Sequence, residues 1–282
     1  MKKHKDIKEN GKIKRWTEEY ISNIFIMYQK RVTTSRYFEG DKGLSNQKLK
    51  NSGGSLRIVV YDFFREQMKN GHLIPGHLIN VKEIGESLGI SMTPLREALV
   101  QLETEGFITV IPRKGVVLNG LSLRKIRHIY SVLGSLEAVA LRDAFCLIDG
   151  DSVENAKKIN AEMKNCLVGN DSQGYLARNN RFHGLWLDRT ENDELLRQIR
   201  IMKERLYEFP GNEDLIPEWE EASLSEHEEL LARIGSGDLE GAIDFLQFVH
   251  WDFVHQERFV RRFYSQHLDS LEKKRGEIVI HW

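Results

Sequence analysis

Apolar residues recur at helical spacing along most of the chain, and this pattern predicts a mainly α-helical protein. Residues 56–70 form one periodic run, and residues 81–88 form a second, shorter one. A third run begins after Ser91, which we expect as its N-cap, with Pro94 in the first turn and Gly106 closing the helix. The first half of the chain is therefore expected to hold three successive short helices.

Two short runs of β-forming residues follow the third helix. They cover Phe107–Ile111 and Val116–Asn119, and Pro112-Arg113-Lys114-Gly115 joins them. This arrangement predicts a hairpin with a basic tip. Three helices and a hairpin in this order are the parts of a winged helix-turn-helix domain, with the helix-turn-helix itself spanning Asn80 to Leu99.

The second helix of such a pair enters the DNA major groove with its N-terminal residues facing the base edges. Ser91 and Thr93 have hydroxyls that suit phosphate contacts. Arg96 has a forked guanidinium that reads guanine or clamps phosphate. The tip Arg113-Lys114-Gly115 would lie along the DNA backbone or in the minor groove. The alternative is an ordinary helix start with solvated surface charges.

The chain from residue 122 onward shows helical patterns only, which predicts an antiparallel helical bundle. Asp151, Ser172 and Asp238 are the expected N-caps. The expected helices cover 122–148, 151–168, 172–190, 193–208, 217–235 and 238–267. The expected domains are an N-terminal extension (1–54), the winged helix-turn-helix (55–121), the helical domain (122–267) and a C-terminal tail (268–282).

Composition narrows the class of protein. Of the 282 residues, 40% are hydrophobic and 29% are charged, as in soluble globular proteins. Apolar runs are far shorter than a membrane span, and the two cysteines form no CxxC pair, so we expect a soluble cytoplasmic protein. Residues 1–15 are expected to be disordered and 16–31 to form a short helix. Residues 1–54 carry a net charge of +7, whereas 123–282 carry −8.

Several short motifs recur together in the first half. They are Pro75-Gly76, Leu88-Gly89-Ile90-Ser91, Thr93-Pro94-Leu95-Arg96-Glu97-Ala98-Leu99, Leu102-Glu103, Glu105-Gly106 and Arg113-Lys114-Gly115. Together they resemble the DNA-binding domain of the GntR family of bacterial transcription regulators. The resemblance implies double-stranded operator DNA as partner and a homodimer on a near-palindromic site. Met92 departs from the family, which often has an arginine there, and methionine donates no hydrogen bond.

The helical half also carries local motifs. Phe182-His183 is followed by Asn192, Glu226-His227 opens a later helix, and Gly237-Asp238 precedes Ala242. These resemble the FCD effector domain of the FadR subfamily over about residues 122–255. The resemblance implies that this half dimerises and binds a small effector.

Many members of this subfamily hold a divalent metal with one Asp or Asn and three histidines, and bind a small carboxylate there. The matching residues are Asn179, His183, His227 and His250, with Asn179 and His183 on one helix face. The resemblance therefore implies one divalent metal ion (Zn²⁺, Ni²⁺ or Mn²⁺) per chain. Neutral imidazoles with one oxygen ligand suit these metals.

Three departures keep an alternative open. Asn179 stands where aspartate is usual, and Leu133 stands where an arginine often precedes Glu137 by one turn. The third histidine is expected at Val249, but it is His250, which lies about 100° further round a helix unless a local bulge intervenes. In the alternative interpretation the histidines are buried and bonded to neighbours without metal, and the effector is more apolar.

We therefore predict a one-component transcription regulator, not an enzyme: a repressor released from operator DNA by a small metabolite such as an organic acid. A metal-dependent enzyme would need a base such as Glu226 or Glu228. The chain has no HExxH, GxSxG or P-loop motif. An effector-free DNA-binding protein is the third alternative.

Overall fold

The structure is a computed structural model that describes residues 5–9, 12–16, 53–69, 72–88, 90–207 and 216–265. The chain divides into two compact units. One comprises residues 1–62 and 80–100, and the other comprises residues 63–79 and 101–282. Helix α2 (Gly53–Lys69) agrees with the first expected helix. The expected C-terminal tail lies outside the described residues.

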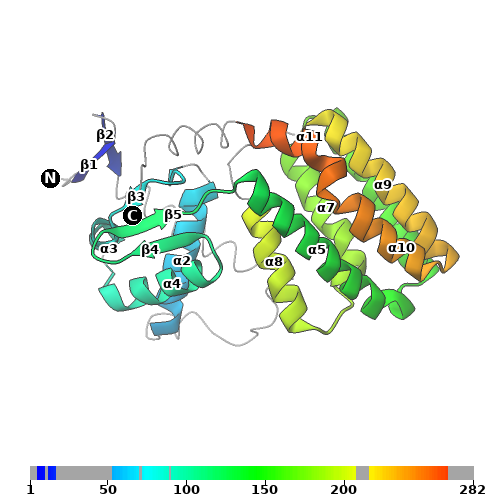
Figure 1. The fold of residues 1–282 in the computed structure, drawn as a ribbon, viewed down its shortest axis with the longest axis horizontal. Coiled ribbons are helices and arrows are strands. Elements are labelled where there is room, and N and C mark those ends of the chain that lie inside the picture. Colours follow the sequence, from blue (N-terminus) through cyan, green and yellow to red (C-terminus); the bar gives the residue numbers. More distant parts are fainter. Residues whose placement is uncertain are drawn as a thin grey trace. The chain divides into compact units, whose positions relative to one another are not determined.

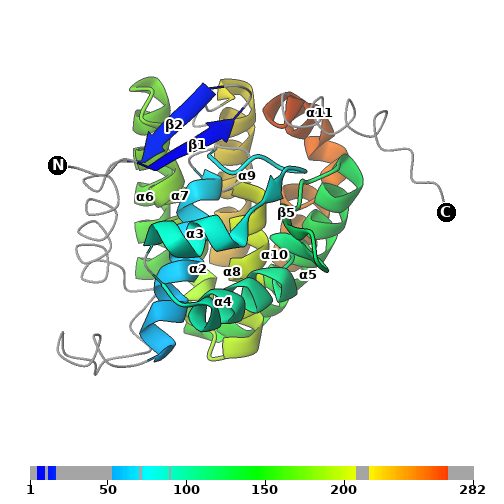
Figure 2. The same cartoon turned by 90° about the vertical axis from the view of Figure 1, so that its left-hand side faces the viewer.

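The first unit contains an unexpected antiparallel hairpin, seen in Figure 2. Its strands are β1 (Lys5–Glu9) and β2 (Lys12–Trp16), paired from Lys5↔Trp16 to Glu9↔Lys12. The prediction of disorder is therefore wrong for the described residues 5–9 and 12–15. The signal was present, because Asn10-Gly11 between the strands is the dipeptide most typical of tight hairpins. The helix predicted over 16–31 lies outside the described residues.

The helix-turn-helix pair of the first unit has the predicted form. Helix α3 spans Val81–Leu88, and α4 spans Met92–Thr104. Gly85 is buried, and a Cβ built on it would lie 3.2 Å from Leu95 Cδ2, so glycine allows close approach between the helices. The Ile90 N–H donates to the Gly85 carbonyl (3.0 Å), which ties the turn to α3.

The second unit contains the predicted hairpin and one further strand. Strands β4 (Ile108–Ile111) and β5 (Gly115–Leu118) are antiparallel, and β3 (Leu78–Ile79) pairs with the other edge of β5. The sequence pattern missed β3 because two residues show no alternation.

The tip of this hairpin is a tight turn. The Lys114 N–H donates to the Ile111 carbonyl (3.0 Å), and Arg113 has a φ of 64°. Pro112 before a positive φ gives the turn type II character. A Cβ on Gly115 would lie 2.9 Å from the Ile79 oxygen, so the position after the turn requires glycine. The turn presents exposed Arg113 and Lys114 side chains.

The rest of the second unit is helical, as predicted. Helix α6 packs along α7 and α9. Helix α5 packs against α8 (Figure 1). No helix in the described part of the chain is long and apolar enough to cross a membrane. The main helices are α5 (Leu123–Ala144), α6 (Gly150–Val168), α7 (Ser172–Leu187), α8 (Asp193–Tyr207) and α9 (Pro217–Ser236).

Two of the three predicted N-caps are wrong by one or two residues. Asp149, not Asp151, caps α6, because its carboxylate accepts the Ser152 N–H. Asp171, not Ser172, caps α7 by accepting the N–H of Gly174. The third prediction is confirmed: Asp238 caps α10.

The helix predicted over 238–267 is interrupted. It consists of α10 (Leu239–Phe245), a π-helical turn (Leu246–His250, hereafter the π turn) and α11 (Phe253–Phe263). A π turn holds more residues than an α turn and often marks a functional site. It packs closely on α5 at Gly134, where a Cβ would lie 2.8 Å from Trp251 Cβ.

Substitution Gly134→Ala tests this close approach. The added methyl forces the π turn away from α5, and we expect the free energy of unfolding to fall by about 1–3 kcal/mol. Gly150→Ala is the matched control, because a Cβ there meets nothing within 4 Å. Urea unfolding of both variants measures the difference. Equal stability of the two would show that the helices do not depend on this glycine.

Candidate metal centre and adjacent cavity

Three histidines from different elements meet inside the second unit. His183 comes from α7, His227 from α9 and His250 from the π turn, and one nitrogen of each lies within 4.8 Å of the others. His183 and His227 are 1% and 0% exposed. Burial lowers the pKa of His183 to about 4 and holds that of His227 well below its usual range. Both rings are therefore neutral at pH 7, the state that binds metal ions.

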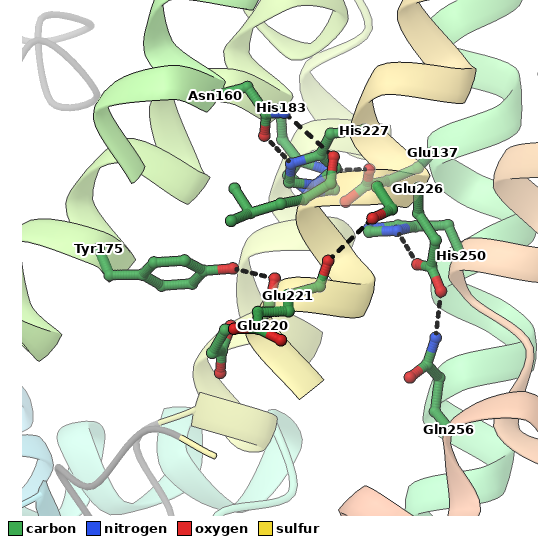
Figure 3. Close-up of polar contacts among 12 residues, drawn as sticks. Glu137, Asn160, Tyr175, His183, Glu220, Glu221, Glu226, His227, His250 and Gln256 are labelled. Carbon is green, nitrogen blue, oxygen red and sulfur yellow. Dashed lines mark hydrogen bonds and ion pairs between the residues drawn. The ribbon is translucent and has the colours of Figure 1, made fainter. Parts of the chain in front are cut away.

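A separate acceptor holds the Nδ1 atom of each ring (Figure 3). Since each acceptor is an oxygen, Nδ1 carries the proton and Nε2 keeps a free lone pair. The described residues offer no partner to His227 Nε2. The three contacts are His183 Nδ1 to Glu137 Oε2 (2.7 Å), His227 Nδ1 to Asn160 Oδ1 (3.0 Å) and His250 Nδ1 to Glu226 Oε2 (2.8 Å).

Two further contacts orient the acceptors. Asn160 Nδ2 donates to the Leu224 carbonyl (3.0 Å), which turns its amide oxygen toward His227. Gln256 Nε2 donates to Glu226 Oε1 (3.0 Å). Outer hydrogen bonds of this kind are typical of metal-binding histidines, because they fix the tautomer and the ring orientation.

The π turn explains how His250 reaches the cluster. In a continuous α-helix the expected position is Val249, and His250 would lie about 100° away. The wider π turn accommodates one more residue than an α turn before His250. This extra residue turns the His250 side chain to the helix face that the family position 249 would occupy. The bulge that the sequence required is therefore present. It was not predictable from helical periodicity.

Glu137 is fully buried on α5 and also binds Lys203, whose Nζ lies 2.6 Å from Glu137 Oε1. Burial raises the pKa of Glu137, but His183 and Lys203 outweigh this effect and hold the pKa well below its usual range. Lys203 on α8 thus supplies the cation missing at Leu133, which is a fully buried core residue. Sequence analysis missed Lys203, because its partner lies on another helix.

Asn179 lies on α7, four residues before His183. Its amide oxygen is buried and has no partner among the described residues. It borders, together with His250, a cavity of about 80 Å³. Six aromatic residues line this cavity: Tyr130, Tyr175, Tyr207, Trp219, Trp251 and Phe263. Its polar lining comprises Asn179, Glu220, Ser223, Glu226, His250 and Gln256.

The two bases named for the enzyme alternative, Glu226 and Glu228, have different surroundings. Both oxygens of Glu226 are bonded, one to His250 and one to Gln256. Glu228 is exposed on α9.

The expected DNA-contacting residues are exposed in their respective units. Ser91, Thr93 and Arg96 lie at the start of α4, where Pro94 and Leu95 are buried instead. In the other unit Arg113 and Lys114 are exposed at the hairpin tip. Met92, which lies between Ser91 and Thr93, is 38% exposed.

Comparison with known proteins places the chain in a family. The model of the gntR family of bacterial regulatory proteins matches residues 57–118, and that of the FCD domain matches 128–247. A transcriptional regulator of the helix-turn-helix type from Agrobacterium vitis is 31% identical over 44% of this chain and 75% of its own length. The chain belongs to the GntR family.

Other relatives agree. The regulator YdhC of Bacillus subtilis is 23% identical over 66% of this chain and 83% of its own. The solved structure of McbR/YncC from E. coli has a similar fold, with a TM-score of 0.56, 21% identity and coverage of 76% and 99% of the two chains. This GntR-family protein is therefore a DNA-binding transcriptional regulator with an FCD domain, which confirms the prediction at this level.

Lys203 is expected to be essential for keeping the Glu137 charge buried. Lys203→Met leaves that carboxylate without its ammonium partner, and we expect a loss of about 3 kcal/mol in unfolding free energy. Adding Glu137→Gln should recover part of the loss, because an amide needs no counter-ion. Urea unfolding of the double-mutant cycle measures both effects.

The control for this cycle is Lys157→Met on α6. Its ion pair with Glu154 is more than half exposed at both side chains, so the change should stay within about 0.5 kcal/mol. If Lys203→Met lowers the free energy of unfolding no more than Lys157→Met does, the assigned ion pair between Lys203 and Glu137 is contradicted.

Glu220 makes the stability of this unit depend on pH. Burial raises its pKa to about 7, although a hydrogen bond from Tyr175 opposes the shift. Between the pKa of Glu220 in the unfolded chain and pH 7, the folded protein keeps a proton on this carboxyl that the unfolded chain has lost. The free energy of unfolding therefore falls as the pH rises through this range. Glu220→Gln should therefore stabilise the protein at pH 8, by up to about 3 kcal/mol, and change little at pH 4.

Thermal unfolding at both pH values checks this expectation. Glu221→Gln is the control, because this neighbouring glutamate is exposed. A Glu220→Gln variant that is less stable than the wild type at pH 8 would contradict a raised pKa of this half-buried carboxylate.

Proposed function

We propose that this GntR-family protein is a metal-containing, effector-responsive repressor that acts in the cytoplasm as a homodimer. The observation that carries the proposal is that one nitrogen from each of His183, His227 and His250 converges within 4.8 Å, while the Nδ1 atom of each ring already bonds an oxygen. Within this arrangement His227 Nε2 is buried without a partner among the described residues. A divalent metal ion fits this donor set.

His183, His227 and His250 would hold the metal, with Asn179 as the oxygen donor bordering the same space. Three neutral imidazoles suit Zn²⁺, Ni²⁺ or Mn²⁺, and the unpartnered Asn179 oxygen supports a fourth ligand position. When bound, the metal supplies open positions for oxygen atoms of an effector. The aromatic cavity beside His250 provides the space for the rest of that molecule.

The DNA-binding half of the proposal rests on the exposed residues of α4 and the hairpin tip. Ser91 directly precedes α4, and Thr93 lies in its first turn. The N-terminus of a helix favours a bound phosphate. Arg96 lies within the first two turns, where a recognition helix meets base edges. Arg113 and Lys114 add phosphate contacts from the hairpin.

The effector acts through a difference in affinity for two states of the dimer. Two recognition helices bind a near-palindromic operator only at a fixed spacing. An effector that binds better to a dimer with another spacing therefore releases the DNA. Release of operator by a small molecule separates this function from an effector-free DNA-binding protein.

Arg96→Ala tests the DNA contact directly, with operator fragments selected by the wild-type protein from random DNA. The loss of a bidentate contact should weaken specific binding roughly 10- to 100-fold at fixed salt, measured by fluorescence anisotropy. Arg197→Ala is the control, since this arginine is bonded to Glu194 on the surface of α8. Equal affinity of Arg96→Ala and wild type would contradict the assignment.

A further inference from the structure

The cavity beside the histidines is rich in acceptors and rings and poor in cations. Two carboxylates, Glu220 and Glu226, line it, and none of the lining residues that the structure describes is Lys or Arg. The ammonium of Lys203 lies 5.7 Å from the centroid of the Trp251 ring, and Glu137 already binds it. The cavity therefore offers no counter-charge to an anionic group.

The Gln256 side chain indicates that the cavity lacks a hydrogen-bond donor. Its side chain is 4% exposed, and its Nε2 faces Glu226 Oε1 at 3.0 Å. A flipped amide would place its oxygen against this carboxylate, so the orientation is fixed. Its Oε1 is buried in the lining without a partner among the described residues. A buried acceptor of this kind requires a donor from a ligand or from water.

Glu220 adds a second group that needs a donor or a cation. It lies on α9 beside Tyr175, whose hydroxyl is 3.5 Å from the Glu220 backbone oxygen (Figure 3). Burial raises its pKa to about 7, and no Lys or Arg in the described part of the chain forms an ion pair with its carboxylate. Burial also raises the pKa of Tyr130 well above its usual range, and both lining carboxylates add to that shift.

We propose that the effector carries a protonated amine, which Glu220, the Gln256 oxygen and the aromatic rings hold in this cavity. This inference rests on the proposed effector-binding function and names the class of ligand. Faces of Trp and Tyr rings attract cations, and a desolvated ammonium gains most from a buried carboxylate. A hydroxyl in the same place donates one hydrogen bond but leaves the Glu220 charge uncompensated.

The same molecule can carry an acid group at its other end. With a divalent metal on the histidines, the metal, Glu220 and Glu226 have a net charge of zero and Lys203 balances Glu137, while the Glu220 carboxylate itself has no described cation paired with it. A ligand with both an ammonium and a carboxylate keeps this buried region neutral, whereas a simple organic acid adds an unpaired negative charge. An amino acid therefore fits better than the corresponding hydroxy acid.

Matched ligand pairs test this preference. Calorimetric titration of the zinc-loaded, full-length protein compares alanine with lactate, serine with glycerate, and 4-aminobutyrate with 4-hydroxybutyrate. We expect at least one amino compound to bind about tenfold or more tightly than its hydroxyl partner, because a hydrogen bond to a charged group replaces a neutral one. Glu220→Gln should abolish this preference, and Glu221→Gln should retain it.

Each other outcome overturns the proposal. Hydroxy acids that bind as tightly as their amino partners would overturn the amine assignment and leave the effector-responsive function intact. An amine preference that persists in Glu220→Gln would overturn the role of Glu220. Binding of none of the six compounds would overturn the ligand class, while operator affinity, measured separately with Arg96→Ala, reports on the DNA-binding function.

Discussion

The helical domain depends on hydrogen bonds that hold three imidazoles by their Nδ1 atoms, those of buried His183 and His227 and of half-buried His250. Each bond fixes one ring, so that the Nε2 lone pairs of His183, His227 and His250 meet. The acceptors come from α5, α6 and α9, and the rings come from α7, α9 and the π turn. The centre therefore joins nearly every long helix of the domain.

Two departures from the family pattern are compensated by other parts of the chain. The one-residue displacement of His250 is absorbed by the π turn, which requires the close approach to α5 at Gly134. The missing arginine at Leu133 is replaced by Lys203, which reaches Glu137 from α8. Glu220 has no such partner, and this costs stability in the absence of ligand. A buried carboxylate that destabilises the fold is typical of a binding site.

Local features of the fold were predictable, whereas features that depend on distant contacts were not. Helix α3 and the hairpin follow from periodicity and turn residues close in sequence. The N-cap of α6 was misplaced because Asp149 and Asp151 are both suitable, and only the bond to Ser152 decides between them. The residues of the site came from a resemblance, but the π turn that unites them depends on packing against α5, which no local pattern records.

Metal content of protein purified without an affinity tag or chelator tests the central claim most directly. Wild type, His250→Ala and His255→Ala are compared by elemental analysis, since His255 is exposed on α11 and bonded to Asp252. The account predicts about one divalent metal ion per chain in the wild type and in His255→Ala, and its loss in His250→Ala. A wild-type protein that stays metal-free after incubation with Zn²⁺, Ni²⁺ and Mn²⁺, or a His250→Ala variant that retains its metal, would contradict it.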